Sequence, residues 1–242
     1  MNQTLSLYPN VILKKNLIKR LFNFKQVFNF ALFSEKMDKR EIIISTAMRL
    51  FAQKGFEGTS VREIASGADV NPAMISYYFG SKEKLFEKLV EHKAAFLKSV
   101  FAELVNNTSL TQLEKLFIII DSYVDRMFQT PQFHHLLHRE LSLDRRPQLK
   151  DAISEILLRN LVSVRKIIQD GIESGEFKMV DPELTIASII GTISHLLSSE
   201  IMCRKILNKT KDFNPFQSKK LKERISEHLK QLMRSHLLKK NH

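Results

Sequence analysis

Cysteine, glycine and proline are scarce in this chain, and tryptophan is absent. Its 242 residues include one cysteine, seven glycines and six prolines. The single cysteine, Cys203, cannot form an intrachain disulfide, which excludes a disulfide-stabilised secreted scaffold and favours the reducing cytoplasm. We expect Cys203 to be a small buried residue of a helix, because free cysteines are usually buried. No apolar run approaches the roughly 18 residues that a membrane span requires, so we expect no membrane partner.

Helical periodicity is what the sequence has in abundance. Apolar residues recur at spacings of three and four almost throughout, and this pattern with so few glycines and prolines predicts an all-α protein. A hydrophobic content of 43% is enough for a substantial core in one or two domains.

Positive charge is plentiful but unevenly distributed. The formal net charge is +12, which favours a nucleic-acid partner. Met1–Lys36 carries six basic and one acidic residue, Arg204–His242 carries twelve and three, and Met37–Glu91 carries eight of each. Met37–Glu91 is therefore formally neutral, and net charge does not locate a nucleic-acid site.

The first 36 residues form an extension with two interpretations. Lys14–Phe33 mixes basic and apolar residues and could form an amphipathic helix on a membrane surface. Alternatively, translation begins at Met37, directly before the recognisable domain. We favour the second interpretation, in which residues 1–36 are not translated or are disordered.

Helix-start and helix-stop signals follow one another closely after Met37. Asp38 and Glu41 form a capping-box pattern, and Gly55 is a left-handed helix stop, so we expect a helix of about four turns between them. Thr59 or Ser60 then caps a short second helix.

A sharp turn and a third helix come next. Asp69 tolerates the left-handed backbone that the turn requires. Asn71 caps the third helix with Pro72 at its first position, and Gly80 ends it. Two short helices separated by about three residues are typical of a helix-turn-helix, whose second helix enters the major groove.

The outward residues of this motif are the predicted DNA contacts. Small side chains let the backbone approach base edges, and hydroxyl and amino groups can contact phosphates. The predicted set is Thr59, Ser60, Arg62, Asn71, Ala73, Ser76, Tyr77, Tyr78 and Lys82.

The run from Thr59 to Phe86 resembles the DNA-binding domain of the TetR family of bacterial transcriptional regulators. It reads TSVREIASGADVNPAMISYYFGSKEKLF. The matching positions are Thr59, Ile64-Ala65, Val70, Tyr78-Phe79, Ser81-Lys82-Glu83 and Leu85. Two positions depart from the family pattern: Asp69 replaces the usual turn glycine, and Ser76 stands where a further tyrosine is frequent.

The resemblance implies residues 37–85 as the DNA-binding domain and 86–242 as a helical-bundle domain for effector binding and dimerisation. It implies a ligand-responsive homodimeric repressor that binds a palindromic operator in double-stranded DNA and is released by a small-molecule effector; an activator of the same fold is the alternative. Effector-pocket candidates are Phe117, Ile120, Tyr123, Met127, Phe133 and Leu137. A helix over residues 183–203 and one over 218–238 would pair across the dimer through Ile186, Ile189, Ile190, Ile193, Leu196, Leu197, Leu221, Ile225, Leu229, Leu232 and Met233.

A histidine cluster offers a competing function. His134 and His138 are four residues apart and could present two ligands to a metal, with His135 between them. Two ligands do not make a site, and neither an HExxH motif nor a cysteine set accompanies them. A helical-bundle metal-dependent hydrolase is therefore the weaker alternative, and we expect no enzyme activity, metal or cofactor.

Overall fold

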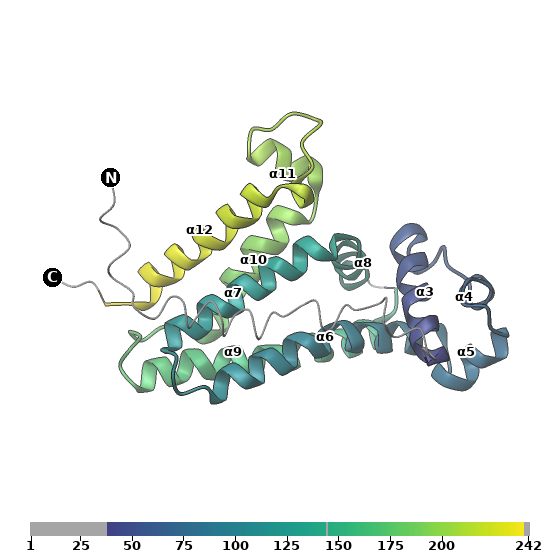
Figure 1. The fold of residues 1–242 in the computed structure, drawn as a ribbon, viewed down its shortest axis with the longest axis horizontal. Helices are drawn as coiled ribbons and strands as arrows, with labels where there is room; N and C mark the ends of the chain where they lie inside the picture. The colour runs from purple at the N-terminus through teal and green to yellow at the C-terminus, as the bar shows by residue number, and fades with distance from the viewer. Residues whose placement is uncertain (1–37, 144, 240–242) are drawn as a thin grey trace. The chain divides into compact units, whose positions relative to one another are not determined.

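A computed structural model describes residues 38–143 and 145–239 of the chain, which fold as helices joined by turns (Figure 1). This bears out the prediction of an all-α fold. The helices are α3 (Lys39–Lys54), α4 (Val61–Gly67), α5 (Pro72–Phe79), α6 (Lys82–Asn106), α7 (Gln112–Gln129), α8 (Pro131–Ser142), α9 (Pro147–Glu173), α10 (Pro182–Leu197), α11 (Glu200–Ile206) and α12 (Lys219–Leu237), with a 3-10 turn, η1 (Pro215–Gln217), before α12.

The backbone adopts a left-handed conformation, with positive φ, at the positions where the sequence signals predict the ends of α3, α4 and α5. Gly55, Asp69 and Gly80 have φ values of 79°, 50° and 82°. Asp69 is one of two non-glycine residues with positive φ in the described part of the chain. These turns allow three short helices to pack closely against each other.

The remaining helices form a bundle. α6 and α9 lie side by side, α7 packs against both α9 and α12, and α10 packs against α9 (Figure 1). Each long helix buries an apolar stripe, as the three- and four-residue spacing predicts.

The predicted helix over residues 183–203 is wrong as a single element. α10 ends at Leu197 and α11 begins at Glu200, with a bend of 101° between their axes. Ser199 has an extended backbone, and its side chain accepts a hydrogen bond from the Met202 amide, so it caps a new helix. Cys203 on α11 is buried, as predicted.

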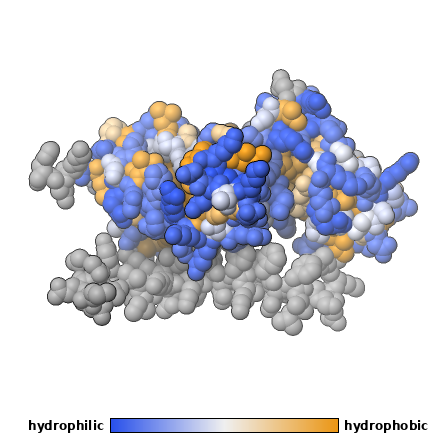
Figure 2. Space-filling view, turned by 90° about the horizontal axis from the view of Figure 1, so that it is seen from above, coloured by the Kyte–Doolittle hydropathy of each residue, from blue (hydrophilic) through white to orange (hydrophobic). Residues whose placement is uncertain are grey.

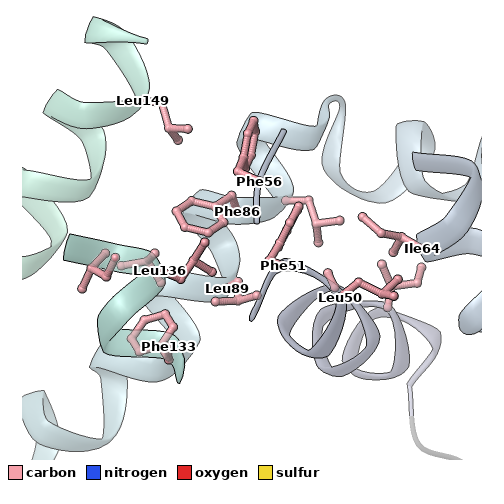
Figure 3. Close-up of a cluster of buried hydrophobic side chains, with 14 of the residues drawn as sticks. Leu50, Phe51, Phe56, Ile64, Phe86, Leu89, Phe133, Leu136 and Leu149 are labelled. Carbon is pink, nitrogen blue, oxygen red and sulfur yellow. The ribbon is translucent and has the colours of Figure 1, made fainter. Parts of the chain in front are cut away.

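One hydrophobic cluster includes residues of α3, α4 and α5 as well as residues of the bundle (Figure 3). At its centre the Phe51 and Phe56 rings stack with centroids 5.3 Å apart, and the Phe86 ring meets both edge-on at 5.4 Å. Phe133 and Leu136 of α8 pack into the same cluster. α6 begins inside this cluster and continues into the bundle, so the backbone is helical across the predicted domain boundary at residues 85 and 86. The boundary itself stays a prediction.

The surface is mainly hydrophilic on the face that Figure 2 shows, with small separate hydrophobic patches.

None of the described helices is by itself long and apolar enough to cross a membrane, although the bent pair α10 and α11 together passes the same test of length and composition. The predictions for residues 1–36 lie outside the described residues.

Phe86→Ala tests the shared cluster. Phe86 is fully buried against two aromatic rings, so its truncation should lower the free energy of unfolding by about 3–5 kcal/mol in urea denaturation. Tyr77→Ala is the matched control, because its side chain is 82% exposed and its loss should change stability by less than about 0.5 kcal/mol. Equal effects of the two substitutions would contradict this packing.

Candidate DNA-binding surface and effector cavity

The start of α4 is held by a capping box. The Ser60 side chain accepts from the Glu63 amide, and the Glu63 carboxylate accepts from the Ser60 amide at 2.8 Å. Lys54 donates to the same carboxylate at 2.6 Å. Hydrogen bonds from Lys54 and then Ser60 lower the pKa of the exposed Glu63 carboxyl to about 2. Ser60 is therefore the cap, and it lies on the exposed side of the helix beside Arg62.

The outward side of α5 carries most of the predicted contacts. The Asn71 side chain accepts from the Ala73 amide at 2.9 Å and so fixes the start of the helix. Asn71, Ala73, Ser76 and Tyr77 are all exposed, and the Tyr77 ring lies edge-on to the half-buried Tyr78 ring at 5.2 Å. The turn and caps thus present one helix face with small residues and one large aromatic side chain.

Two predicted contacts have their side chains turned inward. Thr59 is 1% exposed and its hydroxyl donates to the Gly55 carbonyl at 2.8 Å. The Lys82 ammonium donates to the carbonyls of Phe56 and Thr59 at 3.0 and 3.1 Å and lies 4.3 Å from the centre of the Phe56 ring. In this structure Lys82 ties α6 to the loop before α4, a long-range contact that the local sequence pattern could not reveal.

A cavity of about 180 Å³ lies inside the bundle. Five helices, α6 to α10, contribute its largely apolar lining. The lining residues are Val90, Lys93, Ala94, Leu97, Phe101, Ile119, Tyr123, Arg126, Phe133, His134, Leu137, Leu157, Asn160, Leu161, Val164, Ile186, Ile189 and Ile190.

Polar groups gather at one part of this lining. Arg126 donates to the Lys93 carbonyl at 2.9 Å, and Asn160 donates to the next carbonyl of α6, that of Ala94, at 3.2 Å. His134 lies beside them, and its buried Nε2 makes no hydrogen bond. Burial, followed by the charge of Arg126, lowers the pKa of His134 to about 4.

Half of the predicted pocket residues line the cavity, and the other half do not. Tyr123, Phe133 and Leu137 are lining residues, whereas Phe117, Ile120 and Met127 are not. The guanidinium of Arg234 on α12 lies 5.0 Å from the centre of the Phe117 ring. The wide apolar face of α7 is divided between α12 and the cavity, a division that helical spacing alone does not specify.

The cavity shares part of its wall with the cluster that holds the DNA-binding helices. Val90, Phe133, Leu137 and Leu157 belong to or pack against that cluster, and they also line the cavity. A ligand in the cavity would therefore contact residues on which the position of α3 to α5 depends.

Ion pairs also link the loop before α4 to α8 and to the loop before α9. Arg146, in the loop before α9, pairs with Glu57 of the loop before α4 and with Glu140 of α8. Its guanidinium also lies 4.3 Å from the centre of the Phe56 ring.

The side chains of the three neighbouring histidines lie in three different environments. His134 lies at the cavity, His135 bonds to the Leu197 carbonyl at 2.9 Å, and His138 is exposed. Within residues 38–143 and 145–239, no group of three or more His, Cys, Asp or Glu side chains could hold a metal ion.

Two capped helices joined by a tight turn, with an exposed second helix, define a helix-turn-helix DNA-binding protein. Comparison with known families agrees. The model of bacterial regulatory proteins of the tetR family matches residues 43–89, and that of the YsiA-like protein C-terminal region matches residues 89–213. The chain belongs to the TetR family of transcriptional regulators, as the sequence motif predicts, and this family consists of regulators and not of enzymes.

Individual relatives are similar over most of the same region. "Probable HTH-type transcriptional regulator YttP" of Bacillus subtilis (strain 168) is 37% identical over 142 residues, 58% of this chain. "HTH-type transcriptional repressor NicS" of Pseudomonas putida is 31% identical over 147 residues, 57% of this chain. Each match spans 66% of the relative's own length.

A solved structure is similar over a larger share of the fold. The transcriptional regulator FadR from Bacillus subtilis, crystallised in complex with stearoyl-CoA, superposes with a TM-score of 0.64 and 25% identity. The superposition covers 78% of this chain and 96% of that one.

His134 gives the stability of the protein a specific pH dependence. Its folded pKa of about 4 lies below the ordinary value of 6.5, so between these values the unfolded chain binds more protons. The free energy of unfolding should fall by roughly 3 kcal/mol as the pH drops through this window. His134→Gln should flatten the profile, and His138→Gln, at an exposed histidine of the same helix, should not. Parallel profiles for wild type and His134→Gln in urea denaturation would refute the assignment.

Proposed function

We propose that the chain is a homodimeric repressor that binds a palindromic operator through α4 and α5 and releases it when an effector occupies the cavity. The observation that carries the proposal is the outward face of α5, where Asn71, Ala73, Ser76 and Tyr77 are exposed together on a capped helix. Arg62 and the cap Ser60 extend this surface onto α4. One helix of this length contacts few base pairs, so two copies and two half-sites are needed for specificity.

The dimer surface that we propose differs from the one that the family resemblance implies. Most of the expected apolar residues of α10 and α12 are buried inside their own chain, whereas Ile190 and Leu196 are half-buried and Leu232 is exposed. The buried ones are Ile186, Ile189, Ile193, Leu197, Leu221, Ile225, Leu229 and Met233. The outward side of α10 is a better candidate, because Leu184 is 66% exposed and Ala187 and Gly191 beside it are small and exposed. Small residues let two helices approach closely about a two-fold axis.

The release of DNA by an effector follows from the thermodynamic linkage between the two binding equilibria. A ligand weakens DNA binding only if it binds the DNA-free conformation more tightly, and about 1.4 kcal/mol of preference gives tenfold release. The cavity wall shared with the DNA-binding helices provides a physical route for this coupling. The stearoyl-CoA complex of the similar FadR makes an acyl-bearing molecule the first effector class to examine.

Tyr77→Ala tests the DNA surface. Losing this exposed aromatic side chain should raise the dissociation constant for DNA from the region upstream of the gene roughly tenfold, measured by fluorescence anisotropy at fixed salt. Met179→Ala is the matched control, because Met179 is 83% exposed and lies between α9 and α10. An unchanged constant for Tyr77→Ala would show that α5 does not read the operator. Lys82→Ala is a poorer test, since Lys82 also holds the fold together.

Gly191→Arg tests the dimer surface. Apart from its own helix backbone and chain neighbours, a Cβ at Gly191 meets no atom of the described residues within 4 Å, so we expect the substitution to leave the protomer intact and to place a long cation on the outward side of α10. Sedimentation velocity should show a dimer for wild type and for Met179→Arg, and a monomer for Gly191→Arg. A wild-type monomer, or a Gly191→Arg dimer of wild-type affinity, would place the interface elsewhere.

A further inference from the structure

The effector cavity has an uneven charge distribution that indicates the chemistry of its ligand. We propose that it selects a free carboxylate on a compact apolar tail, with the carboxylate held by Lys93 and Arg126. This inference rests on the proposed effector function of the cavity and specifies the class of effector.

Lys93 and Arg126 are positive side chains at an apolar cavity, and neither forms an ion pair with a carboxylate of the described residues. The one hydrogen bond between them joins the Arg126 guanidinium to the Lys93 carbonyl, which leaves both charges uncompensated. Burial lowers the pKa of both groups, and the charge of Arg126 lowers that of Lys93 further. Charged groups removed from water without a partner are costly. A ligand carboxylate would offset this cost, which a neutral ligand cannot do.

His134 is a further polar group of the same part of the lining. Its Nε2 is buried without a hydrogen-bond partner, which is unusual for a polar atom inside a folded protein. Beside a bound anion the pKa of this imidazole would rise, and the protonated ring would donate to the carboxylate.

The rest of the lining specifies the tail. Phe101 lies eight residues after Lys93 on α6, about 12 Å farther along the helix. On α7 the order is reversed, with Ile119 two turns before Arg126, and Ile186 of α10 is a further apolar lining residue. The ligand would therefore place its charged end near α8 and its apolar end toward Phe101 and Ile119.

The volume limits the size of this tail. The cavity of about 180 Å³ is only moderately larger than an engineered cavity of about 150 Å³ that holds benzene. A phenyl ring or a short alkyl chain fits this space. A carboxylate at the cationic end would also contact α6, α7 and α8 at once, next to Phe133 of the cluster shared with the DNA-binding helices.

Acid and amide pairs provide the experiment. The purified full-length protein is titrated by calorimetry, with thermal unfolding alongside, using phenylacetate, the straight-chain carboxylates from butanoate to dodecanoate, and the primary amide of each. Acids of fitting length should bind at least about tenfold more tightly than their amides, because a hydrogen-bonded charge pair is worth about that factor or more. Arg126→Met and Lys93→Met should each remove most of this preference while amide binding is retained. Lys98→Met, at an exposed lysine of the same helix, is the control and should bind like wild type.

Equal affinity for acid and amide, or no binding by any acid of the series, would overturn the inference without any variant. Acid binding that is unchanged in Arg126→Met and Lys93→Met would overturn it as well, as would an acyl-CoA that binds more tightly than every free acid. The proposed function is judged separately, by the affinity of the ligand-free protein for upstream DNA. Failure of DNA binding would refute the proposed operator-binding repressor and leave the acid-against-amide result standing.

Discussion

The packing of Phe51, Phe56 and Phe86 in one cluster with Phe133 and Leu136 holds α3, α4 and α5 against the helical bundle. The buried residues of α3, α4 and α5 share one core with residues of α6, α8 and α9. We expect this shared core to couple movements of these three helices to the bundle. Close-packed protein interiors transmit the displacement of one side chain to its neighbours, because they allow few alternative side-chain arrangements.

Local signals accounted well for the caps and turns of α4 and α5. Asn71 with Pro72, Asp69 and Gly80 act through their own backbone, so their roles could be predicted without knowledge of distant contacts. The family motif added the identity of the fold. Lys82 was different: its ammonium turns to two carbonyls more than twenty residues earlier in the chain, and no periodicity encodes such a contact.

The cavity was predictable only in part, because its walls come from five helices. Tyr123, Phe133 and Leu137 were predicted, but the choice between cavity and core along α7 depends on where α12 packs. Lys93 and Arg126 were missed because each is a single charge on its helix, and only the fold brings both to the lining of one cavity. The break between α10 and α11 was missed because serine is compatible with both a helix interior and a cap.

In the proposed mechanism, filling the cavity weakens DNA binding. A substitution that fills the cavity tests this coupling without a ligand. Val164 is a buried lining residue of α9, and Val164→Phe would extend a ring into the space. The measurement is the dissociation constant of Val164→Phe for upstream DNA at fixed salt, compared with wild type and with Leu158→Phe at an exposed position of the same helix. We expect about tenfold weaker binding for Val164→Phe alone. A folded Val164→Phe protein that binds DNA as tightly as wild type would show that the cavity and the DNA surface are not coupled.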